Sequence, residues 1–267
     1  FLKIPIAHLH GGESTSGAFD EPIRHSITKI AWWHFVAAKE YKERVVQLGE
    51  NPNRVFNVGG MGVDTIKKTE LLQKNELSKS LGFKFKKHNL LITYHPVTME
   101  NDSSESQIKS LLNALSKLKD TLLIFTLPNS DSNNRIISEM INNYVNENDD
   151  SISFTTMGQL NYLSAMKYVD GVVGNSSSGL AEAPTFKIGT INIGDRQNGR
   201  LKAKSVIDCL PEETSILNAI KKMYSNKFQD NLSSVVNPYG EGDASDKIYK
   251  ILKTIDIPTE LKKEFYD

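Results

Sequence analysis

The chain has 267 residues, of which 39% are hydrophobic and 24% charged, with 32 Lys and Arg balanced by 32 Asp and Glu. This composition predicts an ordinary globular protein with a sizeable core, and the balanced charge argues against nucleic acid or an anionic membrane as a partner. The single cysteine, Cys209, excludes an intrachain disulfide and a multi-cysteine metal site, and we expect it to be a small buried side chain.

Short apolar runs alternate with amphipathic stretches of helical length. The predicted strands are residues 4–8, 34–37, 55–58, 90–94, 122–127, 152–155, 171–173 and 190–193. The predicted helices are residues 22–30, 39–48, 106–118, 135–146 and 160–168. In 106–118, for example, Ile108, Leu111 and Leu115 recur at helical spacing. Strand and helix in regular succession predict parallel sheets covered by helices, an α/β fold.

The lysine-rich segment 67–88 interrupts this alternation and predicts a join between two units. The chain begins directly in a predicted strand without an initiator Met, and a complete domain usually has about 100 to 150 residues. We therefore expect residues 1–66 to be the C-terminal half of a first domain whose beginning is missing. Residues 67–239 then form a second, nucleotide-binding domain.

The stretch "GNSSSGLAEAP", residues 174–184, follows an apolar run and precedes a predicted helix that starts near Gly179. In open parallel sheets, ligands bind where strand ends meet helix N-termini, and small residues let an anion approach the free N–H groups there. Ser176 and Ser177 are therefore candidates for a phosphate cradle. On spacing alone, a serine-rich turn and helix cap is the favoured interpretation of the same residues.

Further along, Glu182 is expected about one turn inside that helix. A carboxylate suits the two neighbouring hydroxyls of a ribose, although an exposed helix glutamate is the other interpretation. In "INIGDRQNGR", residues 191–200, Arg196 and Arg200 lie on a Gly-rich loop after a strand. They would suit a diphosphate, and a solvated loop is the alternative.

Ionisable residues crowd the stretch "HLHGGESTSGAFDEPIRH", residues 8–25. The members that suggest acid and base chemistry are His8, His10, Glu13, Asp20, Glu21, Arg24 and His25. Two glycines separate His10 from Glu13, which argues against the helical presentation of a zinc motif, so we expect no metal. A separate candidate ligand is His95, which ends a predicted strand just before a proline.

Two nucleotide-binding motifs are not supported. The serine loop has no lysine of the P-loop kind, and "GGMGVDTI", residues 59–66, lacks the third glycine of a dinucleotide fingerprint. We therefore expect neither a Walker ATPase nor a NAD-dependent dehydrogenase.

The sequence resembles the hydrolysing UDP-N-acetylglucosamine 2-epimerases of bacterial sialic and legionaminic acid biosynthesis. The resemblance covers nearly the whole chain. It rests on "HLHGGESTSGAFDEPIRHSITKIAWWHF", "EYKERVVQLGENPNRVFNVG", "YHPVT", "GNSSSGLAEAP" and "INIGDRQNGR", in that order, and on the closing "EFYD".

The resemblance implies a glycosyltransferase-B-like fold, with two Rossmann-like parallel-sheet domains and a C-terminal helix near 244–254, within residues 240–267, that packs back on the first. Relatives carry an arginine segment and an Asp-Arg strand end that would precede Phe1, and several have glutamate at the position of His10. The first domain is thus expected to be incomplete.

The resemblance also implies a chemistry. A carboxylate removes the C2 proton while the diphosphate leaves, a glycal forms, and water adds as C2 is protonated on the opposite face. The implied acid/base residues are Asp20, Glu13 and His10. The implied substrate-binding residues are Arg24, His95, Asn129, Ser176, Ser177, Glu182 and Arg196. No cofactor or metal is needed.

We expect the substrate to be UDP-N-acetylglucosamine, giving N-acetylmannosamine and UDP. A UDP-2,4-diacetamido-trideoxyglucose or a GDP-linked sugar remains open, as do a glycosyltransferase of the same fold and an inactive nucleotide-sugar-binding fragment. The family further implies a homo-oligomer. The lack of a long apolar run or signal peptide predicts a cytoplasmic protein without membrane contact.

Overall fold

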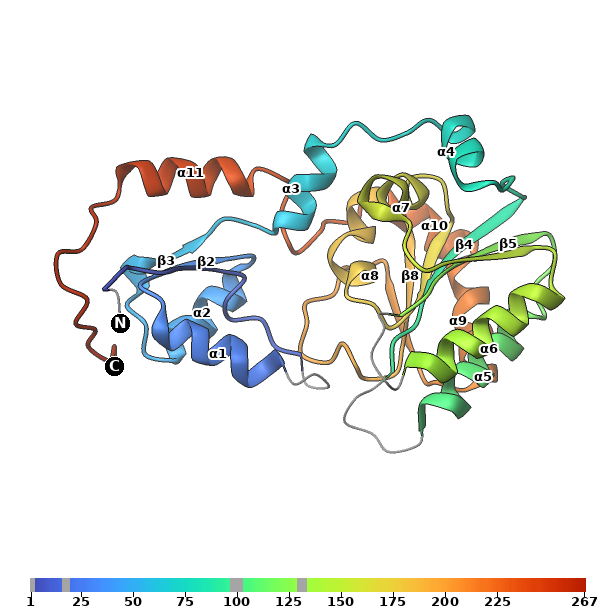
Figure 1. Cartoon of the computed structure of the whole chain (residues 1–267), viewed down its shortest axis with the longest axis horizontal. Helices are drawn as coiled ribbons and strands as arrows, with labels where there is room; N and C mark the ends of the chain where they lie inside the picture. Colours follow the sequence, from blue (N-terminus) through green and yellow to red (C-terminus); the bar gives the residue numbers. More distant parts are fainter. Residues whose placement is uncertain (1–2, 16–19, 97–102, 129–133) are drawn as a thin grey trace.

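The computed structural model describes residues 3–15, 20–96, 103–128 and 134–267. Its strands form two separate parallel sheets (Figure 1). We call the smaller sheet with its helices the first unit and the larger one with its helices the second unit. None of the helices within these ranges is both long and apolar enough to cross a membrane.

The first unit contains a three-stranded sheet in the order β1-β2-β3, where β1 is Ala7–Leu9, β2 is Trp33–Val36 and β3 is Val55–Asn57. Helix α1 (Asp20–Ile30) connects β1 to β2, and α2 (Lys39–Gln47) followed by the short η1 (Pro52–Arg54) connects β2 to β3. All four side chains of β2 are buried because the central strand is covered on both faces, which is why it reads as a continuous apolar run.

The second unit contains a six-stranded sheet in the order β6-β5-β4-β7-β8-β9. The strands are β4 (His88–Thr93), β5 (Thr121–Thr126), β6 (Ser151–Phe154), β7 (Gly171–Gly174), β8 (Gly189–Ile193) and β9 (Val206–Cys209). From β4 the chain adds strands in one direction and from β7 in the other, so the order reverses between these two neighbours. Ligands of open α/β sheets bind at the carboxyl ends of the strands at such a reversal.

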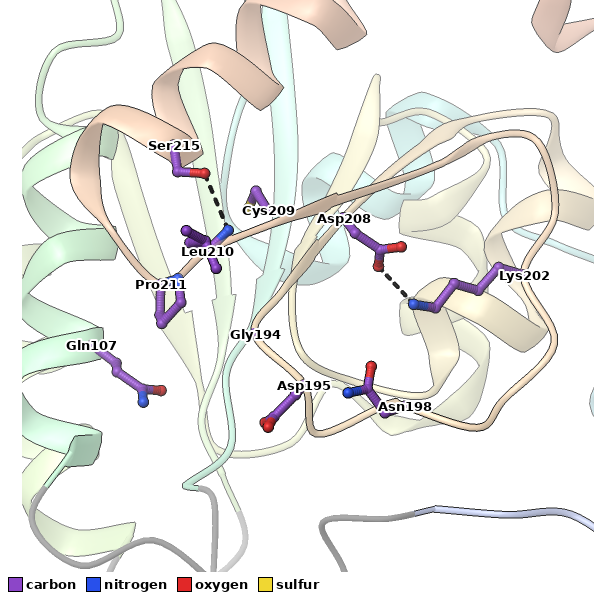
Figure 2. A pocket seen from close by; sticks show the side chains of 10 residues that line it. All are labelled: Gln107, Gly194, Asp195, Asn198, Lys202, Asp208, Cys209, Leu210, Pro211 and Ser215. Atoms are coloured by element: carbon purple, nitrogen blue, oxygen red, sulfur yellow. Dashed lines mark hydrogen bonds and ion pairs between the residues drawn. The ribbon is translucent and has the colours of Figure 1, made fainter.

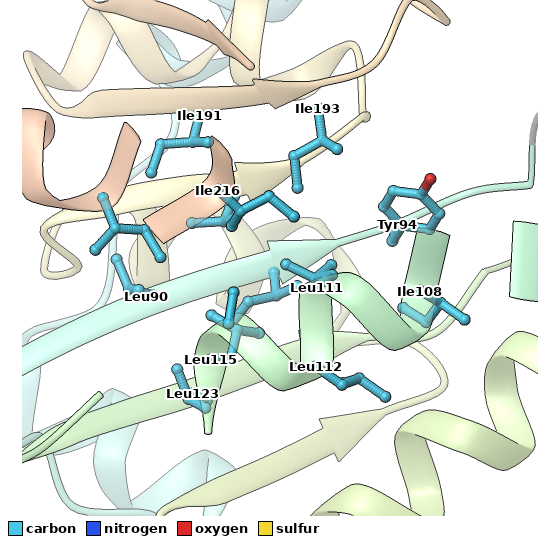
Figure 3. Close-up of a cluster of buried hydrophobic side chains, with 14 of the residues drawn as sticks. Leu90, Tyr94, Ile108, Leu111, Leu112, Leu115, Leu123, Ile191, Ile193 and Ile216 are labelled. Atoms are coloured by element: carbon cyan, nitrogen blue, oxygen red, sulfur yellow. The ribbon is translucent and has the colours of Figure 1, made fainter. Parts of the chain in front are cut away.

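Helices cover both faces of this sheet. They are α4 (Lys74–Leu81), α5 (Ser103–Leu115), α6 (Asn134–Glu147), α7 (Gly158–Met166), α8 (Ser178–Ala181), η2 (Ala183–Phe186), α9 (Glu213–Met223) and α10 (Asn226–Leu232). Successive strand residues point to opposite faces. Leu90 therefore joins the cluster under α5, α6 and α9 (Figure 3), whereas Leu91 joins the cluster under α4 and α7.

The chain returns to the first unit at its C-terminal end. Helix α11 (Ala244–Thr254) contacts α3 (Met61–Lys68) and lies beside the strands of the first unit (Figure 1). Its Ile248 belongs to the same buried cluster as Trp33 and Phe35. Beyond α11, Lys263 forms an ion pair with the fully buried Glu50, at 2.5 Å. The C-terminal segment is thus fastened to the first unit by a charge as well as by apolar contacts.

Every predicted strand and helix of the sequence analysis overlaps an observed one, although the helix expected from Gly179 is only a single turn followed by η2. The structure adds α3, α4, β9, α9 and α10. The predicted boundary between residues 66 and 67 falls inside α3, so we propose that the connection between the units lies just after it, in residues 69–73.

Candidate functional site

Three predicted site residues of the second unit, His95, Ser176 and Arg196, follow the carboxyl ends of β4, β7 and β8. Thr93 and Gly174 pair at the ends of β4 and β7, so the loops that carry His95 and Ser176 start side by side. Arg196 follows β8, the next strand in the sheet. This is the point at which the strand order reverses, as the fold predicts for a ligand site.

Asn175, which the sequence analysis did not select, fixes these loops to one another. It is 1% exposed, and its side chain accepts a hydrogen bond from the His95 N–H and donates one to the His95 carbonyl, each at 2.7 Å. The backbone carbonyl of Asn175 accepts hydrogen bonds from Arg196 at 3.1 Å and Gln197 at 2.8 Å. Asn175 therefore determines where His95 and Arg196 lie relative to each other.

His95 and Arg196 differ in their charge near neutral pH. Burial, reinforced by the charge of Arg196, lowers the pKa of His95 to about 4, so its imidazole is neutral near pH 7. Burial also lowers the pKa of Arg196, with Arg200 acting in the same direction and Asp20 opposing it, but a guanidinium remains charged. Arg196 thus supplies the positive charge, while His95 supplies a hydrogen-bonding group.

The serine loop differs from the expected helix N-terminus. Gly174 has φ +138°, and a Cβ there would lie 1.9 Å from the Thr93 carbonyl oxygen, so glycine is required. Helix α8 has a single turn, and among the described residues the Ser177 side chain makes no capping hydrogen bond. A one-turn helix has a small dipole, so any anion site here depends on individual N–H and hydroxyl groups.

A cavity of about 330 Å³ opens at the ends of β4 to β7, and both His95 and Ser176 line it. Residues 155–159 and Tyr162 also line this cavity. Ser178 lines it too, whereas Ser177 does not, and the Ser178 hydroxyl lies 2.7 Å from that of Tyr162. The structure therefore brings two of the loop's three serines to the same cavity as His95.

Glu182 lies where the two units meet. It is partly buried, and a Cβ on Gly62 of α3 would lie 3.3 Å from its Oε1. Burial raises the pKa of Glu182, whereas a hydrogen bond with Ser178 lowers it, and the net direction is upward. Ser178 thus connects this carboxyl group to the 330 Å³ cavity.

In the first unit, His10 and Glu13 form a hydrogen-bonded pair after β1. His10 Nδ1 lies 2.9 Å from Glu13 Oε1, and the Met61 N–H donates to His10 Nε2 at 3.4 Å. The Nδ1 atom therefore carries the proton shared with Glu13. His10 has φ +63°, a conformation uncommon outside glycine, which indicates that its surroundings hold it there.

The other polar residues of this stretch surround that pair. Arg24 donates to the Glu13 carbonyl at 3.3 Å and to the Glu21 carboxylate at 3.2 Å. Glu21 also accepts hydrogen bonds from the Ser14 hydroxyl and the Thr15 N–H, which ties α1 to the segment that carries Glu13. The structure gives Glu21 and Arg24 a role in shaping this segment.

Asp20 is the exposed first residue of α1. It is close enough to Arg196 for its negative charge to raise the pKa of that residue. Asn129, the remaining predicted nucleotide contact, lies outside the residues that the structure describes.

Arg200 does not lie free on a solvated loop. Its guanidinium reaches into the first unit and lies 2.9 Å from Glu13 Oε2. Asn175, Gln197 and this contact of Arg200 were missed at the level of sequence. The one signal in the sequence for these contacts was Asn175 itself, between Gly174 and the serines, because Asn side chains commonly hydrogen-bond to the backbone of loops.

A second cavity, of about 570 Å³, lies beside the loop that carries Arg196 (Figure 2). Asp195 and Asn198 line it, whereas Arg196 and Gln197 of the same loop bind Asn175. Cys209 also lines it and is only partly buried, where we expected a buried side chain. Burial raises the pKa of its thiol to about 12, so the thiol stays protonated near neutral pH.

Comparison with known proteins agrees with the geometry. The family model for UDP-N-acetylglucosamine 2-epimerase matches residues 1–253. The chain is 44% identical to a GDP/UDP-N,N'-diacetylbacillosamine 2-epimerase (hydrolyzing) of Campylobacter jejuni, over 100% of the chain and 69% of the relative. It is 39% identical to the polysialic acid biosynthesis protein P7 of Escherichia coli, over 99% of the chain and 68% of the relative.

Among solved structures, a UDP-GlcNAc 2-epimerase from Neisseria meningitidis, bound to UDP-GlcNAc, superposes with a TM-score of 0.81. The match has 18% identity and covers 95% of this chain and 71% of that one. The α/β, glycosyltransferase-B-like fold predicted for this sequence is therefore confirmed.

Proposed function

The chain belongs to the UDP-N-acetylglucosamine 2-epimerase family, and we propose that it is a hydrolysing 2-epimerase of a UDP-linked 2-acetamido sugar. The observation that carries this proposal is the contact between Arg200 and Glu13, which brings a carboxylate and histidine pair of one unit to the loop that holds Arg196 in the other. Acid and base groups thus face a cationic, anion-binding loop.

For the sugar, we propose a 2,4-diacetamido-trideoxy hexose ahead of N-acetylglucosamine. The support is the 44% identity to the Campylobacter jejuni relative, whose name specifies N,N'-diacetylbacillosamine. UDP-N-acetylglucosamine, the expectation from the sequence, is the second donor to test. The same steps apply to both, because the reacting carbons C1 and C2 and the 2-acetamido group are shared.

The nucleotide would bind along the strand ends of the second unit. The 330 Å³ cavity suits the base, with Tyr162 and residues 155–159 around it. Glu182, connected to that cavity through Ser178, suits the ribose hydroxyls. His95, Ser176 and Arg196 would hold the diphosphate beside it, since they supply an imidazole, a hydroxyl and a positive charge.

The reaction would use two faces of the sugar. As the C1–O bond to the diphosphate breaks, a carboxylate removes the C2 proton, and the electron pair of that C–H bond forms the C1–C2 double bond of a glycal. Arg196 stabilises the negative charge on the departing UDP. Water then adds to C1 while a proton returns to C2 on the opposite face, which inverts that carbon and releases the free sugar.

We assign Asp20 as the first acid/base group because it is exposed and close enough to Arg196 for the two charges to interact. Glu13 is already bonded through both oxygens, to His10 and to Arg200, so we propose that it orients His10, which carries the proton for the opposite face.

The test is to incubate the protein in D₂O with the UDP-linked diacetamido sugar, UDP-N-acetylglucosamine and a GDP-linked analogue. Release of UDP with deuterium at C2 of the inverted free sugar supports the proposal, and the relative kcat/KM values rank the donors. Sugar transfer that requires an added acceptor would indicate a glycosyltransferase instead. Binding of all donors without turnover would indicate a binding module.

A further inference from the structure

The ion pair between Arg200 and Glu13 joins residues 187 positions apart in the chain, one from each unit. The two side chains are only 14% and 7% exposed, and the separation of 2.9 Å is that of a charge-assisted hydrogen bond. Breaking a buried ion pair leaves the remaining charge without compensation, which is strongly unfavourable. This contact is therefore a strong constraint on how the units meet.

The segment around Arg200 is fixed to the first unit at several points. A Cβ on Gly199 would lie 3.0 Å from the Ser14 hydroxyl oxygen, so the two backbones approach closely. The Leu201 N–H donates to the Tyr41 hydroxyl at 3.2 Å. Arg200 Nε is buried and has no partner among the described residues, and Arg200 is not one of the residues that line the cavity with His95. These contacts favour a role within the junction over direct binding of a diphosphate.

Four charged or titratable groups face Glu13. They are His10 after β1, Arg24 on α1, Arg200 from the loop after β8 and Tyr239 from the segment before α11. Burial raises the pKa of Glu13, but the hydrogen bond from His10 and the charges of Arg200, His10 and Arg24 outweigh it, so the net direction is downward. Arg200 is the one of these groups that comes from the loop shared with Arg196.

We propose that Arg200 is a positioning residue of the proposed reaction: it reaches from the diphosphate-binding loop into the first unit and holds the Glu13 carboxylate ionised and directed at His10. The proton-carrying pair is then complete only when the loop of Arg196 is seated on the first unit. The expected effect of Arg200 on turnover rests on the proposed function. Its effect on the ionisation of the Glu13 carboxylate does not.

The experiment compares Arg200→Gln and Arg200→Lys with Lys202→Gln in the full chain. Lys202 is the control, since it lies two residues away and loses an ion pair of similar length but greater exposure, to Asp208 at 2.8 Å, without touching Glu13. The pKa of Glu13 is measured by carbon NMR on the free protein, with Glu13→Gln to assign the signal. Turnover, UDP affinity and melting temperature are measured in parallel.

We expect Arg200→Gln to raise the pKa of Glu13 by about 1 to 3 units, because an adjacent positive charge lowers a carboxyl pKa by that amount. kcat should fall by about a hundredfold, the size of effect produced by misplacing a catalytic group, while UDP affinity stays within about threefold. Arg200→Lys should restore most of the pKa and the turnover. Lys202→Gln should change neither.

Several results would overturn the inference. They are an unchanged Glu13 pKa in Arg200→Gln, or a loss of UDP affinity with normal turnover at saturating substrate, which would make Arg200 a diphosphate ligand. If Arg200→Gln fails to fold, Arg200→Lys decides. A changed turnover with an unchanged Glu13 pKa, or a changed pKa with unchanged turnover, would then overturn the inference. Absence of turnover by the unmodified protein with every donor contradicts the proposed function instead, and the NMR measurement then still decides the state of Glu13.

Discussion

The side chain of Asn175 holds the backbone of His95 through two hydrogen bonds of 2.7 Å, one to its N–H and one to its carbonyl. An amide side chain provides a donor and an acceptor at once, so it can satisfy both groups of a neighbouring peptide. The loops after β4 and β7 are thereby joined at the point where the strand order reverses.

We predict that Asn175→Ala lowers the free energy of unfolding by about 2 kcal/mol, since two hydrogen bonds are lost and buried partners are left unsatisfied. UDP affinity should fall by about tenfold, because His95 and Arg196 lose their fixed positions. Chemical denaturation and calorimetric titration measure the two effects. Asn231→Ala, which removes an exposed Asn hydrogen bond to Lys227, is the control. Unchanged UDP binding by Asn175→Ala would contradict the positioning role.

Asp20→Asn should abolish turnover and leave UDP affinity within a few fold. A proton carrier contributes roughly 10² to 10⁴ to the rate and little to ground-state binding. Steady-state kinetics and UDP titration of the variant check this, with the exposed Asp230→Asn as a control for a lost carboxylate far from the site. Near-normal activity of the Asp20 variant in an active enzyme would exclude Asp20 as the acid/base group.

Ser177→Ala distinguishes a diphosphate contact from a helix cap. A hydroxyl that binds the diphosphate predicts UDP binding weaker by about 1 to 2 kcal/mol with uridine binding barely changed, the range for a hydrogen bond to a charged group. A cap predicts a loss of roughly 1 kcal/mol in stability, with both ligands affected alike.

We expect Ser177→Ala to lose little folding stability, because the Ser177 side chain makes no capping hydrogen bond among the described residues. Ser225→Ala is the matched control, since Ser225 holds the same position before α10 and also makes no side-chain cap. Equal losses of UDP and uridine affinity in Ser177→Ala would reject the diphosphate contact.

Stability should fall as the pH drops from about 6.5 toward 4. The pKa of both His95 and His34 is lowered to about 4, from 6.5, mainly by burial. Over that interval the unfolded chain binds more protons than the folded one, so each such histidine contributes a slope of about 1.4 kcal/mol per pH unit, lost as the pH falls.

His95→Gln should remove one histidine's share of that slope between pH 6.5 and 5, whatever its effect at pH 7. Below this window, ionised carboxylates with lowered pKa values, those of Glu13, Glu21 and Glu50, add losses of the same sign. Urea denaturation at half-unit steps of pH measures the slope. An identical slope in the variant and the unmodified protein would show that His95 does not titrate as the structure implies.

The alternation of apolar runs and amphipathic stretches was enough to predict both parallel sheets, because strands buried on two faces must be continuously apolar. The elements that were missed carry weaker patterns. Strand β9 is short, lies at the sheet edge and includes the exposed Asp208, and α4 lies in a lysine-rich segment where Leu77 is its one fully buried side chain. Local sequence is least informative where few side chains reach the core.

For the site, the order of motifs in the sequence determined the family and the candidate residues His10, Glu13, His95 and Arg196, since each residue type suits one part of the chemistry. Only the tertiary structure decided their partners. Whether Arg200 faces a ligand, solvent or Glu13 depends on how two units pack across 187 positions of chain, and no local periodicity encodes that distance. The low pKa of His95 also depends on the folded state, because burial and the neighbouring guanidinium of Arg196 are produced by the fold of the second unit and are not properties of the residue itself.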